Sequence, residues 1–348
     1  MAASSCPACP DTSKCPSSAT TVLVIEGGDT LAAFATLYYT YVTNQVLYAW
    51  HKGFVPSVRI NATWARAVLG KPDRHTKLWE RYFESYCPGA ADWAARCSGT
   101  VRERRLIRPC AKGVPLPCSD FIFPWMHLQA PWSVKAWYTG RSPAHIRCQA
   151  EGWCDQYNEP LYRAWRTLGH AVVARAHRWQ PSMRTRAKRA WQAFNPPPTR
   201  RPVLGVHMRG SDKGHGRRPI SFEDFGHAVA TFMSQHPSSG LVWIATDSAG
   251  YAARVEGEWA RRWAGRVFLS PARTRSNSTR GNFEVFDPRL VADEVMTDIA
   301  VLAMCDYLLH GSSAVTEAVI YTNPSLHRRS CNLEYLSWVA CTFVEGAS

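Results

Sequence analysis

After residue 202, short apolar runs alternate with longer stretches of helical spacing. The apolar runs occupy 203–206, 241–245, 266–269 and 307–309. The first helix opens at Ser221 with a capping-box pattern, and further helices are expected over about 250–264, over about 290–304 and from Ser312 onward. Continuously apolar strands that alternate with helices indicate a parallel sheet covered on both faces. The second half of the chain is therefore predicted to be a doubly wound, Rossmann-like α/β domain.

The N-terminal half begins in the same way but continues less regularly. The apolar run 21–25 precedes Gly27 and Gly28 and then the uncharged stretch 30–50. We interpret that stretch as a buried helix of a soluble protein, because its Thr, Asn, Gln and Tyr residues disfavour a membrane span. Residues 60–160 are rich in Trp, Pro and Cys without a clear period, so short helices within irregular structure are expected there.

These patterns predict four segments in the 348 residues. Residues 1–19 resemble a tail or stem, and 20–194 form an N-terminal α/β domain that ends in a basic helical stretch, 161–194. The Pro-rich segment 195–202 interrupts that stretch as a linker. Residues 203–348 form the C-terminal domain.

The net charge of the chain narrows the kinds of molecule that it is expected to bind. The chain carries 41 Lys and Arg residues against 27 Asp and Glu, a net charge of +14, which favours an anionic partner. Nucleic acid, acidic polysaccharide, a membrane surface and a nucleotide phosphate all fit that charge. Residues 161–201 contain ten of the basic residues and no acid. A solvated helix face is the default interpretation of that run, with a groove for an acidic acceptor as the alternative; no recognised nucleic-acid fold accompanies it.

Twelve cysteines suggest an oxidising compartment. The pair Cys6 and Cys9 has the spacing of half a zinc site, but no second pair follows at finger spacing, so disulfides are the preferred interpretation. Their pairing is not readable from the sequence. Sequons at Asn61 and Asn277 also favour the secretory pathway. The first twenty residues lack the pattern of a signal peptide, so membrane attachment would need a targeting segment that is not visible here.

Polar clusters follow three of the predicted C-terminal strands, where ligands bind in open α/β sheets. Cations and the start of a helix suit a diphosphate, and a carboxylate suits ribose hydroxyls or base N–H groups. The clusters contain His207, Arg209, Asp212 and Lys213 after the first strand, Asp247 after the second, and His310, Ser312 and Ser313 after the fourth.

Each cluster also has a purely structural interpretation. The His-x-Arg segment would satisfy a buried carboxylate, and Asp247, Ser312 and Ser313 would cap helices. Because three polar clusters follow neighbouring strands, one common binding site is favoured over three separate structural roles. The sequence has neither the G-x-G-x-x-G nor the P-loop motif, which disfavours a dinucleotide dehydrogenase and a P-loop enzyme. It also has no Asp-x-Asp pair, which disfavours a metal-bridged nucleotide diphosphate.

The same clusters resemble the motifs of the α1,6-fucosyltransferase and protein O-fucosyltransferase superfamily. Segment 206–213 is similar to its His-x-Arg motif, 243–247 to its Ala-Thr-Asp strand end, and 298–313 to its third block. A weaker likeness to its Gly-rich opening and first helix lies in 26–28 and 47–50. The clear resemblance covers about 203–321, with the three blocks in the family's order.

The resemblance implies a GT-B architecture in which the C-terminal Rossmann-like domain binds GDP-fucose and the N-terminal one shapes the acceptor side. It implies inverting transfer without a metal or other cofactor. Arg209 corresponds to the cation on the diphosphate, and His207 to a nucleotide contact, with Asp212 and Lys213 in the same motif. Asp247 and Asp298 would contact the guanine or the ribose, and Ser312 and Ser313 the phosphates.

Two departures from the family pattern concern the residues after Arg209. Many members with sugar acceptors have a second Arg directly after the first, whereas this chain has Gly210. No acid follows the motif until Glu223, so His215 is the nearest group able to act as the catalytic base. A base supplied by the N-terminal half or by the acceptor itself is the alternative.

The sequence thus predicts a fucosyltransferase of the Golgi or ER lumen that acts on a glycan or glycoprotein, with no nucleic acid as partner. Two alternatives stay open. One is a GT-B glycosyltransferase with a different nucleotide sugar. The other is a secreted, non-catalytic basic module that binds acidic polysaccharide.

Overall fold

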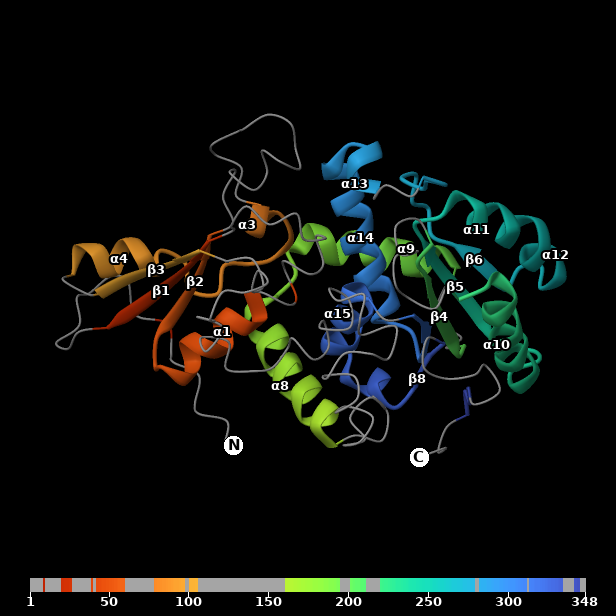
Figure 1. Ribbon diagram of the computed structural model, residues 1–348, viewed down its shortest axis with the longest axis horizontal. Coiled ribbons are helices and arrows are strands. Elements are labelled where there is room, and N and C mark those ends of the chain that lie inside the picture. The colour runs from red at the N-terminus through yellow and green to blue at the C-terminus, as the bar shows by residue number, and fades with distance from the viewer. Residues whose placement is uncertain are drawn as a thin grey trace, which may run out of the picture. The chain divides into compact units, whose positions relative to one another are not determined.

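The computed structural model describes residues 9, 20–26, 39, 42–59, 78–97, 100–105, 160–194, 201–210, 220–278, 282–311, 313–333 and 341–344. Its contacts divide the chain into two units, each an α/β structure (Figure 1). We call Met1–Leu128 with Ala171–Met183 the N-terminal unit, and Gln129–His170 with Arg184–Ser348 the C-terminal unit.

The described part of the N-terminal unit has a parallel three-stranded sheet in the order β2-β1-β3. The strands are β1 (Thr21–Glu26), β2 (Val55–Arg59) and β3 (Thr100–Arg105). Helices α1 (Val42–His51), α3 (Leu78–Tyr82) and α4 (Ala90–Arg96) accompany them. Val22 and Val24 of β1 pack with Trp93 of α4 in one apolar cluster, so the central strand is covered by a helix that follows it in the chain.

The C-terminal unit is built on a parallel five-stranded sheet in the order β6-β5-β4-β7-β8. Its strands are β4 (Val203–Met208), β5 (Leu241–Thr246), β6 (Val267–Leu269), β7 (Tyr307–His310) and β8 (Ser330–Asn332). The intervening segments include α10 (Phe222–Gln235), α11 (Ala249–Arg254), η3 (Val255–Trp259), α12 (Ala260–Arg262), α13 (Asn282–Val285), α14 (Pro288–Leu302), α15 (Ala314–Thr322) and η4 (Pro324–His327).

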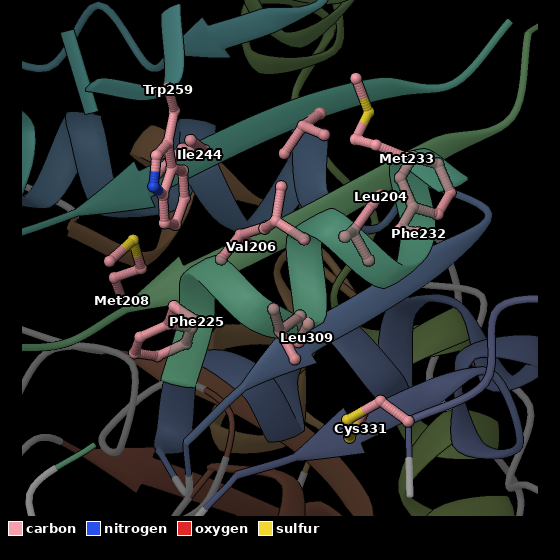
Figure 2. Packing of buried hydrophobic residues seen from close by; sticks show 14 of the residues in the cluster. Leu204, Val206, Met208, Phe225, Phe232, Met233, Ile244, Trp259, Leu309 and Cys331 are labelled. Atoms are coloured by element: carbon pink, nitrogen blue, oxygen red, sulfur yellow. A yellow bond between two sulfur atoms is a disulfide. The ribbon is translucent and has the colours of Figure 1, made fainter. Parts of the chain in front are cut away.

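Helices cover both faces of this sheet. On one face, Leu204 and Val206 of β4 pack against Phe225 and Phe232 of α10 (Figure 2). On the other face, a Cβ atom at Gly205 would lie 2.8 Å from Leu302 Cδ2, at the end of α14. Every residue of β4, β5 and β7 is buried as a result.

The predicted α/β class with a doubly wound C-terminal sheet is confirmed by the two parallel sheets, and the GT-B arrangement of two such halves stays a prediction. The four C-terminal strands were each predicted within about two residues of their ends, which is the usual precision of boundaries. The capping box at Ser221 is also confirmed, because the Ser221 hydroxyl accepts from Asp224 N and the Asp224 carboxylate accepts from Ser221 N.

Strand β3 corrects the expectation of irregular structure with short helices over 60–160. Four of its six residues are charged, Arg102 to Arg105, a composition that disfavours a strand. It is nevertheless paired along its whole length with β1 at the edge of the described sheet. Strands β2 and β8 were also not predicted. Residues 60–77, 98–99 and 106–159 lie outside the described part of the chain.

The basic helical stretch is two helices rather than one. Helix α8 (Pro160–Ala176) ends before a short break, and α9 (Pro181–Phe194) begins at a proline, which fits the first position of a helix. Arg166 of α8 is 2% exposed and forms an ion pair with Glu317 of α15 at 2.5 Å. The interpretation of this run as a solvated face is therefore wrong for Arg166. The predicted linker lies outside the described residues except for 201–202.

The structure contains disulfides between Cys9 and Cys87 and between Cys331 and Cys341. Cys9, considered above as half of a zinc site, is thus covalently bonded to a distant cysteine. Cys97 is also disulfide-bonded, and Cys305 is a buried free thiol. Of the helices described, none is both long enough and apolar enough to cross a membrane.

Gly205 supplies a test of the doubly covered sheet. Alanine there would place Cβ 2.8 Å from Leu302 Cδ2 and 3.0 Å from Cys305 Sγ. We expect Gly205→Ala to lower the free energy of unfolding in urea by about 1–3 kcal/mol through overpacking.

Gly226→Ala in α10 is the matched control. Its Cβ would lie 3.5 Å from Trp259 Cζ2, an ordinary contact, so the stability should stay constant or rise by about 0.5–1 kcal/mol from helix propensity. Equal losses at both glycines would contradict close packing of α14 on β4.

Candidate functional site

Arg209 and Asp247 lie together at the carboxyl ends of β4 and β5. The Arg209 Nε atom is 3.7 Å from Asp247 Oδ2, and the two side chains are 23% and 22% exposed. The Gly210 N–H donates to Asp247 Oδ1 at 2.8 Å. One carboxylate therefore contacts both the cation and the backbone just after it, which limits the positions that the guanidinium can adopt.

Close packing around position 210 explains the glycine there, which the sequence alone did not reveal. A Cβ atom at this position would lie 3.0 Å from both Ser248 Cβ and Tyr251 Cε2. The Tyr251 ring is held in turn, because its hydroxyl donates to Ile220 O at 3.0 Å. A long side chain after Arg209, such as the second Arg of many superfamily members, would have to displace these neighbours.

Two histidines lie behind this edge of the sheet. His207 is 8% exposed and stands opposite Ala245 on one side and His310 on the other. His310 is 1% exposed, and its Nδ1 lies 3.0 Å from Gly311 O. Burial lowers the pKa of His310 to about 4, so this ring is neutral at physiological pH. The sheet thus places a neutral imidazole next to His207.

Ser313 forms the N-cap of α15. Its hydroxyl accepts from Thr316 N at 3.3 Å, while Thr316 Oγ1 accepts from Ser313 N at 3.1 Å. Ser313 is 2% exposed. Its side chain therefore performs the capping role that the structural interpretation foresaw, and phosphate binding by Ser313 stays a prediction. At Asp247 the cap of the next helix is instead the neighbouring residue, Ser248.

Asp298 lies on α14 and faces the segment after β6. Its carboxylate is part-buried and accepts from Ser270 Oγ at 2.7 Å. Burial raises the pKa of Asp298 to about 7, and the hydrogen bond from Ser270 and the positive charge of Arg275 act in the opposite direction. Its predicted contact with the nucleotide stays a prediction. Asp212, Lys213, His215 and Ser312 lie outside the described residues.

The loop 270–278 was missed by the sequence analysis. It follows β6 and reaches the backbone of Asp247, where Ser276 N donates to Asp247 O at 3.0 Å. The Asn282 amide donates to the same carbonyl at 3.2 Å. Its three serines and one asparagine after an apolar strand were the available signal, because that strand ends at the same edge as the other three.

The described residues at the ends of β4, β5 and β7 include the Arg209 guanidinium, a carboxylate that orients it, and buried imidazoles. Such a set can bind an anionic group through charge-assisted hydrogen bonds. Among the residues that the structure describes, no group of three or more His, Cys, Asp or Glu side chains is arranged to hold a metal ion.

The fold and the site define an α/β protein with two parallel sheets and a candidate anion site at the strand ends of the second. Neither a protein-family model nor a curated protein sequence matches the chain.

Fucosyltransferases are among the solved structures to which the chain is similar. The NodZ alpha-1,6-fucosyltransferase soaked with GDP-fucose is 15% identical, with a TM-score of 0.46 over 88% of this chain and 94% of that one. The fucosyltransferase NodZ from Bradyrhizobium is 15% identical over 86% and 92%, with a TM-score of 0.42. POFUT1 in complex with GDP-fucose is 10% identical over 91% and 98%, with a TM-score of 0.43.

The raised pKa of Asp298 predicts a dependence of stability on pH. Because its pKa is about 7 in the folded state against 3.8 ordinarily, rising pH ionises the unfolded state first and destabilises the fold until about pH 7. Asp298→Asn keeps an acceptor for Ser270 and cannot ionise. Its free energy of unfolding relative to wild type should therefore increase by about 1 kcal/mol or more between about pH 5 and about pH 8.

Urea unfolding of both proteins across this range measures the difference. Asp306→Asn, on the segment before β7, is the control for a general charge effect. A difference between Asp298→Asn and wild type that does not change with pH would show that Asp298 ionises normally in the folded protein.

Proposed function

We propose that this protein is an inverting, metal-independent fucosyltransferase that transfers fucose from GDP-fucose to a hydroxyl of a glycan or glycoprotein. The observation that carries the proposal is the Arg209–Asp247 pair at the carboxyl ends of β4 and β5. The motif resemblance supplies the identity of the donor. The Golgi or ER lumen is the proposed location, and the disulfides and the sequons support it.

Arg209 has the central role in the proposed reaction. The acceptor oxygen attacks the anomeric carbon of fucose on the face opposite the nucleotide, and the bond from that carbon to the β-phosphate oxygen breaks. The electron pair of that bond leaves with GDP, whose negative charge increases in the transition state. A guanidinium already held by Asp247 stabilises this charge without reorganisation during the reaction.

The other proposed residues bind the donor or accept the proton. His207, Asp212, Lys213, Asp247 and Asp298 contact the nucleotide sugar. Ser312 and Ser313 place the N-terminal end of α15 against the phosphates, where a helix end favours negative charge. His215 takes the proton of the acceptor hydroxyl as general base.

In the proposed reaction, each predicted domain binds one of the two substrates. Residues 203–348 bind the nucleotide sugar, and 20–194 form the acceptor side. Residues 195–202 link them, and 1–19 are a stem.

Binding of an acidic polysaccharide is the second candidate. The observation that favours it is α9, on which Arg184, Arg186, Lys188 and Arg189 are exposed and no acidic residue occurs. A polyanion-binding module would not need Arg209 beside a strand-end carboxylate, which is why we rank it below the transferase.

Nucleotide binding tests the donor assignment directly. GDP at about 100 times its Kd should stabilise the protein by roughly 2.7 kcal/mol, which raises Tm by several degrees. UDP and ADP should raise it less at the same concentration. Arg209→Ala should raise the Kd for GDP by roughly 10- to 100-fold, because a charge-assisted contact to the diphosphate is lost. Thermal unfolding and calorimetry measure these effects.

Arg261→Ala, an exposed position on α12, is the matched control and should bind GDP like wild type. Equal responses to GDP and UDP would favour a different nucleotide sugar. No response to any nucleotide would overturn the transferase and favour the polysaccharide-binding module, which a heparin column would then test.

Independence from metal is testable in the same preparation. The chain has no Asp-x-Asp pair, so the proposed site relies on Arg209 rather than on a cation bridging the diphosphate. With GDP-fucose and an acceptor found by screening, EDTA should change the initial rate by less than about twofold. A loss that added Mg²⁺ or Mn²⁺ restores would contradict the metal-independent mechanism.

A further inference from the structure

Glu294 of α14 holds the loop 270–278 through both of its carboxylate oxygens. Oε1 accepts from Arg273 N at 2.8 Å, and Oε2 accepts from Thr274 N at 3.0 Å. The Thr274 hydroxyl also donates to Oε2, and Thr274 is 5% exposed. Three donors from two consecutive residues thus converge on one carboxylate. An amide at this position would offer one oxygen and place an N–H group against a donor.

The same helix holds the start of the loop. Asp298 lies one turn after Glu294 and accepts from the Ser270 hydroxyl at 2.7 Å. Ser270 is attached to the sheet as well, because its N–H donates to Ile244 O of β5 at 2.8 Å. The loop is therefore held at two points by carboxylates on α14.

The loop in turn holds the backbone around Asp247. Ser276 N donates to Asp247 O at 3.0 Å, and Ala249 N donates back to Ser276 O at 3.3 Å. The amide nitrogen of Asn282 donates to the carbonyls of both Thr274 and Asp247. Asn282 therefore joins the residue that Glu294 holds directly to the residue that orients Arg209.

We propose that Glu294 is a positioning residue of the donor site, which acts through Thr274 and the loop 270–278 to place the Asp247 carboxylate against Gly210 and Arg209. This proposal rests on the proposed function, because it names the element that orients the cation for the diphosphate. Glu294 itself contacts the loop and not the reacting groups. Through the loop, the core helix α14 thus contributes to the geometry of the site.

Glu294→Gln tests the proposal, with Glu258→Gln as the matched control. Glu258 is exposed and forms an ion pair with Arg254 on the surface. We expect Glu294→Gln to raise the Kd for GDP about tenfold and Glu258→Gln to leave it unchanged. In the Asp247→Asn background, Glu294→Gln should change the Kd by less than about twofold, because the group through which it acts is already altered.

Amide hydrogen exchange gives a measurement that needs no nucleotide. Glu294→Gln should speed exchange at Arg273, Thr274 and Ser276, and also at Gly210, whose N–H donates to Asp247. Thr274→Val removes only the hydroxyl donor to Glu294 and should speed exchange at the same residues by a smaller amount. It replaces Glu294→Gln as the test variant if Glu294→Gln does not fold.

The outcomes separate this proposal from the proposed function. Faster exchange at Gly210 in a protein that binds no nucleotide would support positioning by Glu294 and overturn the donor site. Unchanged exchange at Gly210, or equal losses of GDP affinity with and without Asp247, would overturn positioning while leaving a GDP site intact.

Discussion

The parallel register of β4 between β5 and β7 is the constraint on which the candidate site depends. Met208 stands opposite Thr246, and His207 stands opposite His310, so the three strands end at one level. Polar residues that are far apart in the chain meet there because parallel strands all place their carboxyl ends at the same edge. Arg209 and Asp247 are paired as a direct result.

That register is maintained by close packing on both faces of the sheet. On one side α10 covers β4 with Phe225 and Phe232. On the other side Gly205 leaves room for Leu302 and Cys305, so the end of α14 approaches the strand closely. The same helix carries Glu294 and Asp298, which hold the loop after β6. Helix α14 therefore both packs against the sheet and supports the loop beside the site. A change in its packing would also affect the loop.

Burial shifts the pKa values of the acidic and basic groups around this edge in opposite directions. It raises the pKa of Asp298 and lowers that of His310, because both shifts favour the neutral form. Glu317 is the exception, since its pKa stays below the ordinary value through its ion pair with Arg166 despite its burial. Arg209 and Asp247 differ from these groups in that both side chains are partly exposed, at 23% and 22%.

The sequence by itself determined the α/β class, the four apolar strands of the C-terminal sheet, the capping box at Ser221 and the residues at two strand ends, His207 with Arg209 and Asp247. These follow from local composition and period, which a single segment carries. Strand β3 could not be predicted from the sequence, because its charged residues do not form a strand pattern and are ordered by pairing with β1. The roles of Gly210, Asn282 and Glu294 were missed for the same reason: they are contacts with residues distant in the chain, and only the tertiary structure decides which distant residues meet.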